Sequence, residues 1–355
     1  MLFESINIKN LKSRNRIILS PMAMYSAKNG LPNEFHFVHY GSRALGGVGI
    51  IILEATAIEK KGMITPSDLG LYNKTQMRAL SKIVRFIKKF DAIPGIQIAH
   101  AGRKAGTYVP WEGFGRIPIS EGGWIPVAPS PIPYVEDWIR PKELTQENII
   151  NIQRKFVKSA ILAVESGFKI LEIHAAHGYL IHEFLSPLTN KRKDKYGGNI
   201  ENRIRFLIEI IQKIKEKIPN DIPLFVRISG VDFIENGWNL NDTIFLAKEM
   251  KENGVDLIDC SSGGILPNIR IPDEEGYNVF ISEKIKRNVN IMTSVVGNIY
   301  NKKTAEKILS EGKADMITMG RLLLRDPFWP AREGAKEKKE FYPVQYKRGF
   351  QNLEI

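Results

Sequence analysis

Short apolar runs, many of them rich in isoleucine, leucine and valine, alternate along the chain with longer stretches in which apolar residues recur every three or four positions. Such alternation is typical of repeated strand–helix units. Residues 204–218 illustrate the helical pattern, because their apolar residues fall on one face of a helix. The apolar runs predict eight strands, at residues 16–20, 48–55, 93–99, 169–174, 224–229, 256–261, 290–296 and 315–320.

These predicted strands are almost continuously apolar, as expected of parallel strands that are buried on both faces. Glycines at 167, 254 and 312 precede strands at points where they favour helix termination. Eight strands with intervening helices predict an α/β fold, a closed (β/α)8 TIM barrel formed by residues 1–355 as a single domain. An open doubly wound sheet is the competing fold, but no G-x-G-x-x-G motif follows an early strand.

Two segments depart from the repeated pattern. Residues 101–142, between the third strand and the third helix, are rich in glycine and proline and carry Trp111, Trp124 and Trp138. Because so long a loop in a compact domain is usually functional, we expect it to form a lid over the mouth of the barrel. The tail, residues 329–355, carries several aromatic side chains and is expected to pack on something, such as another subunit.

Composition narrows the classes of function. The single cysteine, Cys260, excludes an internal disulfide, a thiolate zinc site and a cysteine-held iron–sulfur cluster, so redox chemistry would need a bound organic cofactor. No apolar run reaches the ~18 residues of a membrane helix and residues 1–16 lack a signal-peptide pattern, so we expect a cytoplasmic protein without a membrane partner. The net charge of +12 is scattered, which favours solvated faces over a nucleic-acid surface.

Polar side chains gather where the predicted strands end, which is where barrel enzymes place their active sites. His174, His177 and Tyr179 follow the fourth strand, and imidazole and phenol groups can donate hydrogen bonds or a proton. The three-residue spacing of the histidines also allows a metal site, but no third ligand is evident. The other histidines are interpreted as structural or left unassigned: His36, His39, His100 and His182.

A second group indicates a cofactor. Gly297 and Gly320 follow the last two strands and Arg321 adds a cation, as a phosphate site requires, although both glycines could be ordinary turn residues. Arg227 would direct a permanent charge into the barrel mouth, where it must meet an anion or a carbonyl, and Gln97 suits the edge of a heterocycle. Together these residues predict a phosphorylated ring cofactor lying across the barrel.

The strand-end motifs resemble the Old Yellow Enzyme family of FMN-dependent ene-reductases. The resemblance rests on Ser20-Pro21-Met22, Gln97 with His100-Ala101-Gly102-Arg103, His174-Ala175-Ala176-His177-Gly178-Tyr179-Leu180, Phe184-Leu185-Ser186-Pro187, Asn190-Lys191-Arg192 and Gly320-Arg321. The tail segment 345–350 is similar to that of the thermophilic-like branch, in which a C-terminal arginine reaches the neighbouring subunit's site.

The resemblance implies a reaction: NADPH or NADH reduces FMN, and an α,β-unsaturated carbonyl compound then takes hydride at Cβ and a proton at Cα. It implies that His174 and His177 hold the substrate oxygen and that Tyr179 is the proton donor. Tyr25 and, from the neighbouring subunit of a homodimer or homotetramer, Arg348 would line the substrate pocket. The residues implied for FMN are Ser20, Pro21, Met22, Ala23, Ala57, Gln97, Arg227, Gly297, Gly320 and Arg321.

One position departs from the pattern that the resemblance implies. Ala23 stands where that branch usually has cysteine and the wider family often has threonine, and a methyl group cannot donate a hydrogen bond to the flavin. Two other functions compete with ene reduction. One is a flavin barrel that reduces uridines in transfer RNA, but Cys260 does not lie in the Asn-x-Gly-Cys-Pro setting of those enzymes. The other is a catalytically inactive flavin-binding barrel.

Overall fold

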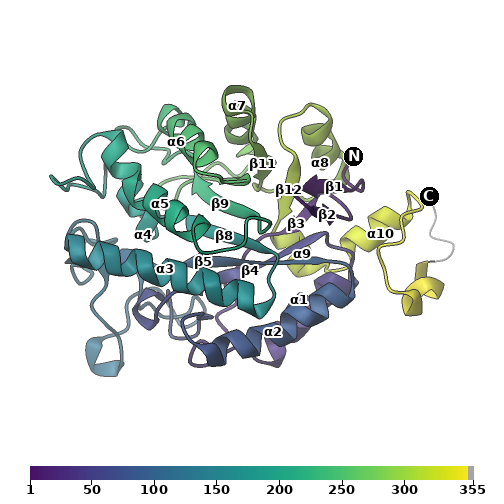
Figure 1. Cartoon of the computed structure of the whole chain (residues 1–355), viewed down its shortest axis with the longest axis horizontal. Helices are drawn as coiled ribbons and strands as arrows, with labels where there is room; N and C mark the ends of the chain where they lie inside the picture. The colour runs from purple at the N-terminus through teal and green to yellow at the C-terminus, as the bar shows by residue number, and fades with distance from the viewer. Residues whose placement is uncertain (351–355) are drawn as a thin grey trace.

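The computed structural model describes residues 1–350, and in it eight parallel strands close into a barrel (Figure 1). They are β3 (Ile17–Leu19), β4 (Ile50–Ala57), β5 (Ile93–Ala99), β8 (Ile170–Ala175), β9 (Leu224–Ser229), β10 (Leu257–Ser261), β11 (Met292–Val295) and β12 (Met316–Met319). The barrel closes where β12 pairs with β3, Ile317 lying opposite Ile17. The predicted (β/α)8 architecture is confirmed, and all eight predicted strands are present.

Helices surround the barrel and bury their apolar faces against the outward-facing strand residues. They are α1 (Glu34–Leu45), α2 (Lys74–Lys89), α3 (Gln146–Ser166), α4 (Leu180–Leu185), α5 (Ile200–Lys215), α6 (Leu240–Glu252), α7 (Val279–Val289), α8 (Lys302–Ser310), α9 (Arg321–Arg325) and α10 (Trp329–Ala335). Several begin at asparagines whose side chains accept the backbone N–H groups of the first turn, as Asn33 does in α1 and Asn239 in α6. Among residues 1–350 no helix has the length and apolar character needed to cross a membrane.

The barrel interior is apolar at the end where the strands begin. Its first layer is a buried cluster formed by Ile18, Ile50, Ile52, Ile170, Phe225, Leu257 and Met316. An antiparallel hairpin, β1 (Ile6–Ile8) and β2 (Leu11–Ser13), covers this layer with Ile8, which is almost completely buried. The sequence did not predict this hairpin. Because side chains alternate along a strand, the interior residues two positions further on form the next layer, and that layer is polar.

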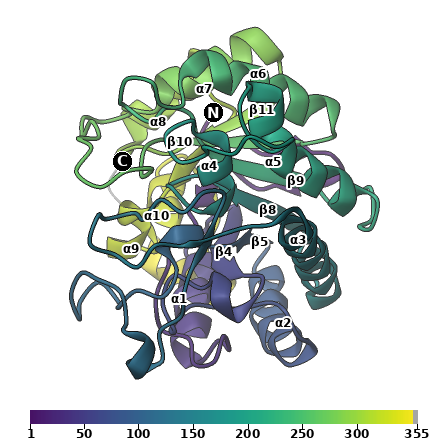
Figure 2. The ribbon, with the colours of Figure 1, turned by 90° about the vertical axis from the view of Figure 1, so that its left-hand side faces the viewer.

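The predicted lid lies beside the carboxyl ends of β5 and β8. It contains two short 3-10 turns, η2 (Gly102–Lys104) and η3 (Ile119–Glu121), and a two-residue strand, β6 (Val127–Ala128), that pairs with β7 (Lys142–Glu143). Figure 2 shows these loops on the side of the molecule that carries α4. The barrel mouth is therefore bordered by the lid.

The tail lies at the other end of the molecule from the lid (Figure 1). Beyond α10 it packs on its own chain, since the ring of Phe341 lies 5.9 Å from that of Phe3 and the ring of Tyr346 lies 5.8 Å from that of Phe328. Its last described element is a 3-10 turn, η4 (Val344–Phe350). Residues 351–355 of the predicted tail lie outside the described residues.

Candidate active site

The end of β8 and the tight turn that joins it to α4 carry the two histidines and the tyrosine that the sequence singled out. His177 (φ +58°) and Gly178 (φ +71°) both adopt left-handed backbone conformations. Gly178 is needed, because a Cβ at this position would lie 2.1 Å from the carbonyl oxygen of Gly264. The turn thus folds closely onto the loop after β10, and it brings the ring of His174 to 5.2 Å from that of His177 and 4.9 Å from that of Tyr179.

Both histidines are neutral hydrogen-bonding groups. Burial, followed by the nearby Arg227 charge, lowers the pKa of His174 and of His177 well below the ordinary value. The N–H of Ala176 donates to His174 Nδ1 over 3.2 Å, so the neutral ring carries its proton on Nε2. His177 Nε2 lies 2.7 Å from Ser261 Oγ. Neutral imidazoles held in this way can donate to a carbonyl oxygen without carrying a charge into the site.

Tyr179 is held in its protonated form. Burial raises the pKa of its phenol well above 10, and the nearby Tyr25, Asp68 and Tyr134 act in the same direction. The ring is only half buried, so it can reach a ligand. A protonated phenol beside two neutral imidazoles provides one proton donor and two hydrogen-bond donors within six residues of the chain.

Below this turn, the polar layer of the barrel joins the predicted cofactor residues to each other. Gln97 Nε2 donates to Glu172 Oε1 over 2.8 Å. Arg227 Nη1 donates to Ser20 Oγ over 2.9 Å and lies 3.1 Å from Asp259 Oδ2. The anion that Arg227 had to meet is therefore supplied by the protein itself.

Sequence reasoning missed both carboxyl groups of this layer. Asp259 Oδ1 also accepts hydrogen bonds from Ser294 and Thr318. Burial raises the pKa of Glu172, and the neighbouring Asp259 raises it further. The charge of Arg227 is thus balanced by one carboxylate, that of Asp259. Arg227 Nε, which is buried without a partner among residues 1–350, remains free to donate.

The backbone of Ala57, which the resemblance places among the FMN-binding residues, already makes two hydrogen bonds within the chain. Its N–H donates to the Leu69 carbonyl over 2.8 Å, and its carbonyl oxygen accepts the N–H of Leu71 over 2.9 Å. The N–H is therefore not available to a ligand. Only the carbonyl oxygen, which has a second lone pair, retains hydrogen-bonding capacity.

A cavity of about 480 Å³ lies at the ends of β11 and β12, where the sequence predicted a phosphate site. Met22, Gly297, Gly320 and Arg321 line it, together with Arg325, which sequence reasoning missed. A Cβ at Gly320 would lie 3.4 Å from Met22 Sδ, within the space of the cavity. Two arginines, exposed backbone and the unpaired Arg227 Nε fit a phosphorylated ring such as FMN.

A second cavity, of about 400 Å³, opens beneath the lid. Tyr25 lines it, with Tyr134 and Trp138 as further aromatic walls. Lys104, which the sequence did not single out, also lines it: Nζ donates to the His177 carbonyl oxygen over 2.9 Å and lies 5.1 Å from the centre of the Tyr179 ring. Burial lowers the pKa of Lys104 to about 8, and the Arg103 charge acts in the same direction.

Two predicted residues have no partner in this arrangement. Ala23 precedes Tyr25 by two residues in the sequence and is half buried. Its methyl side chain cannot form a hydrogen bond. Arg348 is exposed on η4, in the tail, and the tail lies at the end of the molecule away from the lid (Figure 1). The chain therefore does not bring Arg348 to its own substrate cavity, and a contribution from a neighbouring subunit stays a prediction.

Comparison with known proteins agrees with this geometry. The NADH:flavin oxidoreductase / NADH oxidase family matches residues 1–340. The chain is 46% identical to the NADPH dehydrogenase of Bacillus subtilis over 353 residues, covering 98% of this chain and 99% of the relative. It is 45% identical to the NADPH dehydrogenase of Bacillus cytotoxicus over 352 residues, covering 98% and 96%.

Among solved structures, the old yellow enzyme homologue from Zymomonas mobilis matches with a TM-score of 0.80 at 25% identity, covering 100% of this chain and 99% of that chain. The family match spans both cavities and the segment that carries His174, His177 and Tyr179. The chain belongs to the NADH:flavin oxidoreductase / NADH oxidase family, and it is an FMN-dependent NADPH oxidoreductase of the Old Yellow Enzyme type.

Proposed function

We propose that the protein reduces the C=C bond of α,β-unsaturated carbonyl compounds. The observation that carries this proposal is the grouping of two neutral imidazoles and a protonated phenol at the end of β8 and in the turn after it. Lys104, which lines the cavity of about 400 Å³, binds this turn. A substrate with a carbonyl oxygen and a carbon to be protonated needs these groups. A simple electron-transfer flavoprotein would not.

Residues of the barrel would hold the cofactor, with Gly297, Gly320 and Arg321 around the phosphate and Ser20, Gln97 and Arg227 along the ring. When bound, FMN supplies a hydride that originates from NADPH and is delivered to Cβ of the substrate. The Arg227 cation stabilises negative charge that develops beside it, as fixed charges in a buried site do.

The substrate oxygen is held by the two histidines. The Nε2–H of His174 donates to the carbonyl oxygen, together with His177, and both interactions strengthen as negative charge builds on that oxygen. Tyr179 gives its proton to Cα, so that hydride and proton together saturate the double bond, and the phenol regains a proton from solvent. The nearby Lys104 ammonium group stabilises the phenolate between these two events.

Replacing Tyr179 by phenylalanine tests the proposal. The reduction of the flavin by NADPH should keep its rate, whereas oxidation of the reduced enzyme by 2-cyclohexenone should slow by about 10²–10⁴-fold, the usual contribution of a positioned proton donor. Both rates are measured by stopped-flow absorbance, with Tyr72→Phe as a matched control outside both cavities. Wild-type enzyme that NADPH reduces but cyclohexenone does not reoxidise would contradict the proposal.

The structure disfavours a role for Cys260 as the acid of a uridine-reducing enzyme. The side chain is fully buried, and burial raises the pKa of its thiol well above the ordinary value. A thiol in this position cannot reach a substrate in either cavity. The same turn that supports ene reduction also argues against a barrel without catalytic activity.

We also propose that the active unit is a homo-oligomer in which Arg348 completes the neighbouring substrate cavity. The exposure of Arg348 and its distance from the lid of its own chain support this arrangement. Arg348→Ala should raise the KM for cyclohexenone without changing the bound FMN. A monomeric mass in light scattering, together with full activity, would contradict it.

A further inference from the structure

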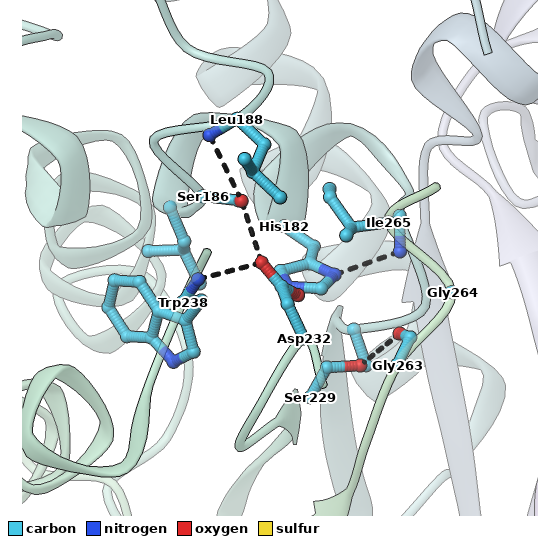
Figure 3. Close-up of polar contacts among 12 residues, drawn as sticks. His182, Ser186, Leu188, Ser229, Asp232, Trp238, Gly263, Gly264 and Ile265 are labelled. Carbon is cyan, nitrogen blue, oxygen red and sulfur yellow. Dashed lines mark hydrogen bonds and ion pairs between the residues drawn. The ribbon is translucent and has the colours of Figure 1, made fainter. Parts of the chain in front are cut away.

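His182 lies on α4, three residues after Tyr179, and it takes no direct part in the proposed reaction. Its ring is completely buried between the turn after β8 and the loop after β9 (Figure 3). The N–H of Gly178 donates to His182 Nδ1 over 2.9 Å. An Nδ1 that accepts a hydrogen bond carries no proton, so the neutral ring must have its proton on Nε2.

That proton faces Asp232. His182 Nε2 lies 3.0 Å from Asp232 Oδ1 in a fully buried charge contact, and neither atom makes a hydrogen bond of good geometry among residues 1–350. Burial alone would raise the pKa of Asp232, but the His182 ring, the Trp238 N–H and the Ser186 hydroxyl outweigh it, and the pKa is lowered overall. Asp232 is therefore a fixed carboxylate that selects one tautomer of His182.

The other carboxylate oxygen of Asp232 accepts two hydrogen bonds. Asp232 Oδ2 accepts hydrogen bonds from the Ser186 hydroxyl over 2.7 Å and from the backbone N–H of Trp238 over 2.8 Å. The Ser186 hydroxyl oxygen in turn lies 3.4 Å from the N–H of Leu188, which directs the hydroxyl proton toward Asp232 (Figure 3). Asp232 thus presents a defined oxygen to His182 and another to its own loop.

We propose that the Asp232–His182 pair is a positioning device, which holds the Gly178 amide and thereby sets His177 and Tyr179 in their working places. This inference rests on the proposed function. The turn needs such support because His177 adopts a left-handed conformation that a residue with a side chain adopts at a cost. Other hydrogen bonds to the backbone of His177 come from the Ser229 hydroxyl, which accepts the His177 N–H over 2.9 Å, and from Lys104, which donates to the His177 carbonyl oxygen.

The alternative is that the pair only stabilises the core, and Asp232→Asn separates the two roles. The Ser186 and Trp238 donors require the amide oxygen on their side, so the amide NH2 must face His182. His182 Nε2 then becomes an acceptor, the proton moves to Nδ1, and Nδ1–H meets the N–H of Gly178. The shape of the side chain is kept while the hydrogen bond to the turn is lost.

A second substitution, at His182, should restore the hydrogen bond to Gly178 that Asp232→Asn removes. In His182→Asn the amide oxygen occupies the place of Nδ1 and can accept from Gly178 without help from Asp232. In His182→Gln the amide reaches the place of Nε2 and can meet Asp232, but nothing accepts from Gly178. The first substitution keeps the link to the turn and loses the link to the carboxylate, and the second does the reverse.

The experiment compares holoenzymes. The rate at which 2-cyclohexenone oxidises the reduced enzyme should fall about tenfold or more in Asp232→Asn and in His182→Gln, as loss of a buried hydrogen bond at the site predicts. The rate should recover in the double variant Asp232→Asn/His182→Asn, and His182→Asn alone should remain close to wild type. Oxidation by dioxygen, which does not use the turn, should be unchanged in all of them, and exposed Asp221→Asn controls for the lost charge.

Amide hydrogen exchange of the peptide that contains Gly178 provides a readout without substrate. It should quicken in Asp232→Asn and slow again in the double variant. A double variant no faster than Asp232→Asn, or His182→Gln at least as fast as His182→Asn, would overturn the inference. If cyclohexenone does not oxidise even the wild type, the proposed function fails, whereas the exchange measurement still decides the role of His182.

Discussion

Glu183, on α4, should make the protein less stable as the pH rises. It is completely buried, Oε1 accepts the N–H of Arg103 over 2.8 Å, and Oε2 has no partner among residues 1–350. Burial raises the pKa of its carboxyl from 4.5 to about 8, despite the nearby Arg103 charge. Between these values the folded chain keeps a proton that the unfolded chain releases, so the free energy of unfolding falls as pH rises.

The size of the effect follows from the two pKa values. With 4.5 in the unfolded chain and about 8 in the folded one, Glu183 alone lowers the free energy of unfolding by about 2.5 kcal/mol between pH 5 and pH 7. Glutamine has the shape of the protonated acid and can still accept from Arg103. Glu183→Gln should therefore match the wild type near pH 4.5 and be more stable at pH 7.

Urea unfolding of the FMN-saturated enzyme between pH 5 and pH 8 measures this difference. Other buried carboxyl groups with a raised pKa, Glu54 at about 8 and Asp68 at about 7, act alike in both proteins and cancel. Glu165→Gln, on the exposed face of α3, is the matched control. If the wild-type and Glu183→Gln curves run parallel over this pH range, Glu183 is ionised in the folded protein and the reasoning fails.

Three further outcomes are expected. Gly178→Ala would place a Cβ 2.1 Å from the Gly264 carbonyl oxygen in a left-handed backbone, so enone reduction should fall at least tenfold while bound FMN, measured by absorbance, is retained. Arg321→Ala removes a cation from the phosphate cavity and should weaken FMN binding about tenfold or more, as fluorescence titration of the released flavin would show. Ala23→Cys should shift the midpoint potential of the flavin in a spectroelectrochemical titration; an unchanged potential would show that position 23 does not tune it.

The sequence predicted the barrel because its pattern is repeated, and the polar layer could also have been predicted. Polar residues recur at every second position along three strands, which places them on the interior face. They are Glu172 and His174 in β8, Arg227 and Ser229 in β9, and Asp259 and Ser261 in β10. Treating these runs as continuously apolar concealed the carboxyl partners of Gln97 and Arg227.

Other features depend on contacts that no local pattern contains. Lys104 gains its place from the fold of the lid, which brings it to carbonyl groups more than seventy residues away in sequence. The role inferred for His182 depends on its contact with Asp232, which lies fifty residues further along the chain. The hairpin formed by β1 and β2 has strands of three residues, which are too short to show a period.

The pairing of β12 with β3 determines when this chain can finish folding. The seam joins residues 17–19 to residues 317–319, and the N-terminal ammonium group lies 3.0 Å from Glu306 on α8. At ordinary rates of translation these partners are made roughly 15–60 s apart. During that interval the apolar first strand has no partner on one side, so the nascent barrel stays open until nearly its last strand has left the ribosome.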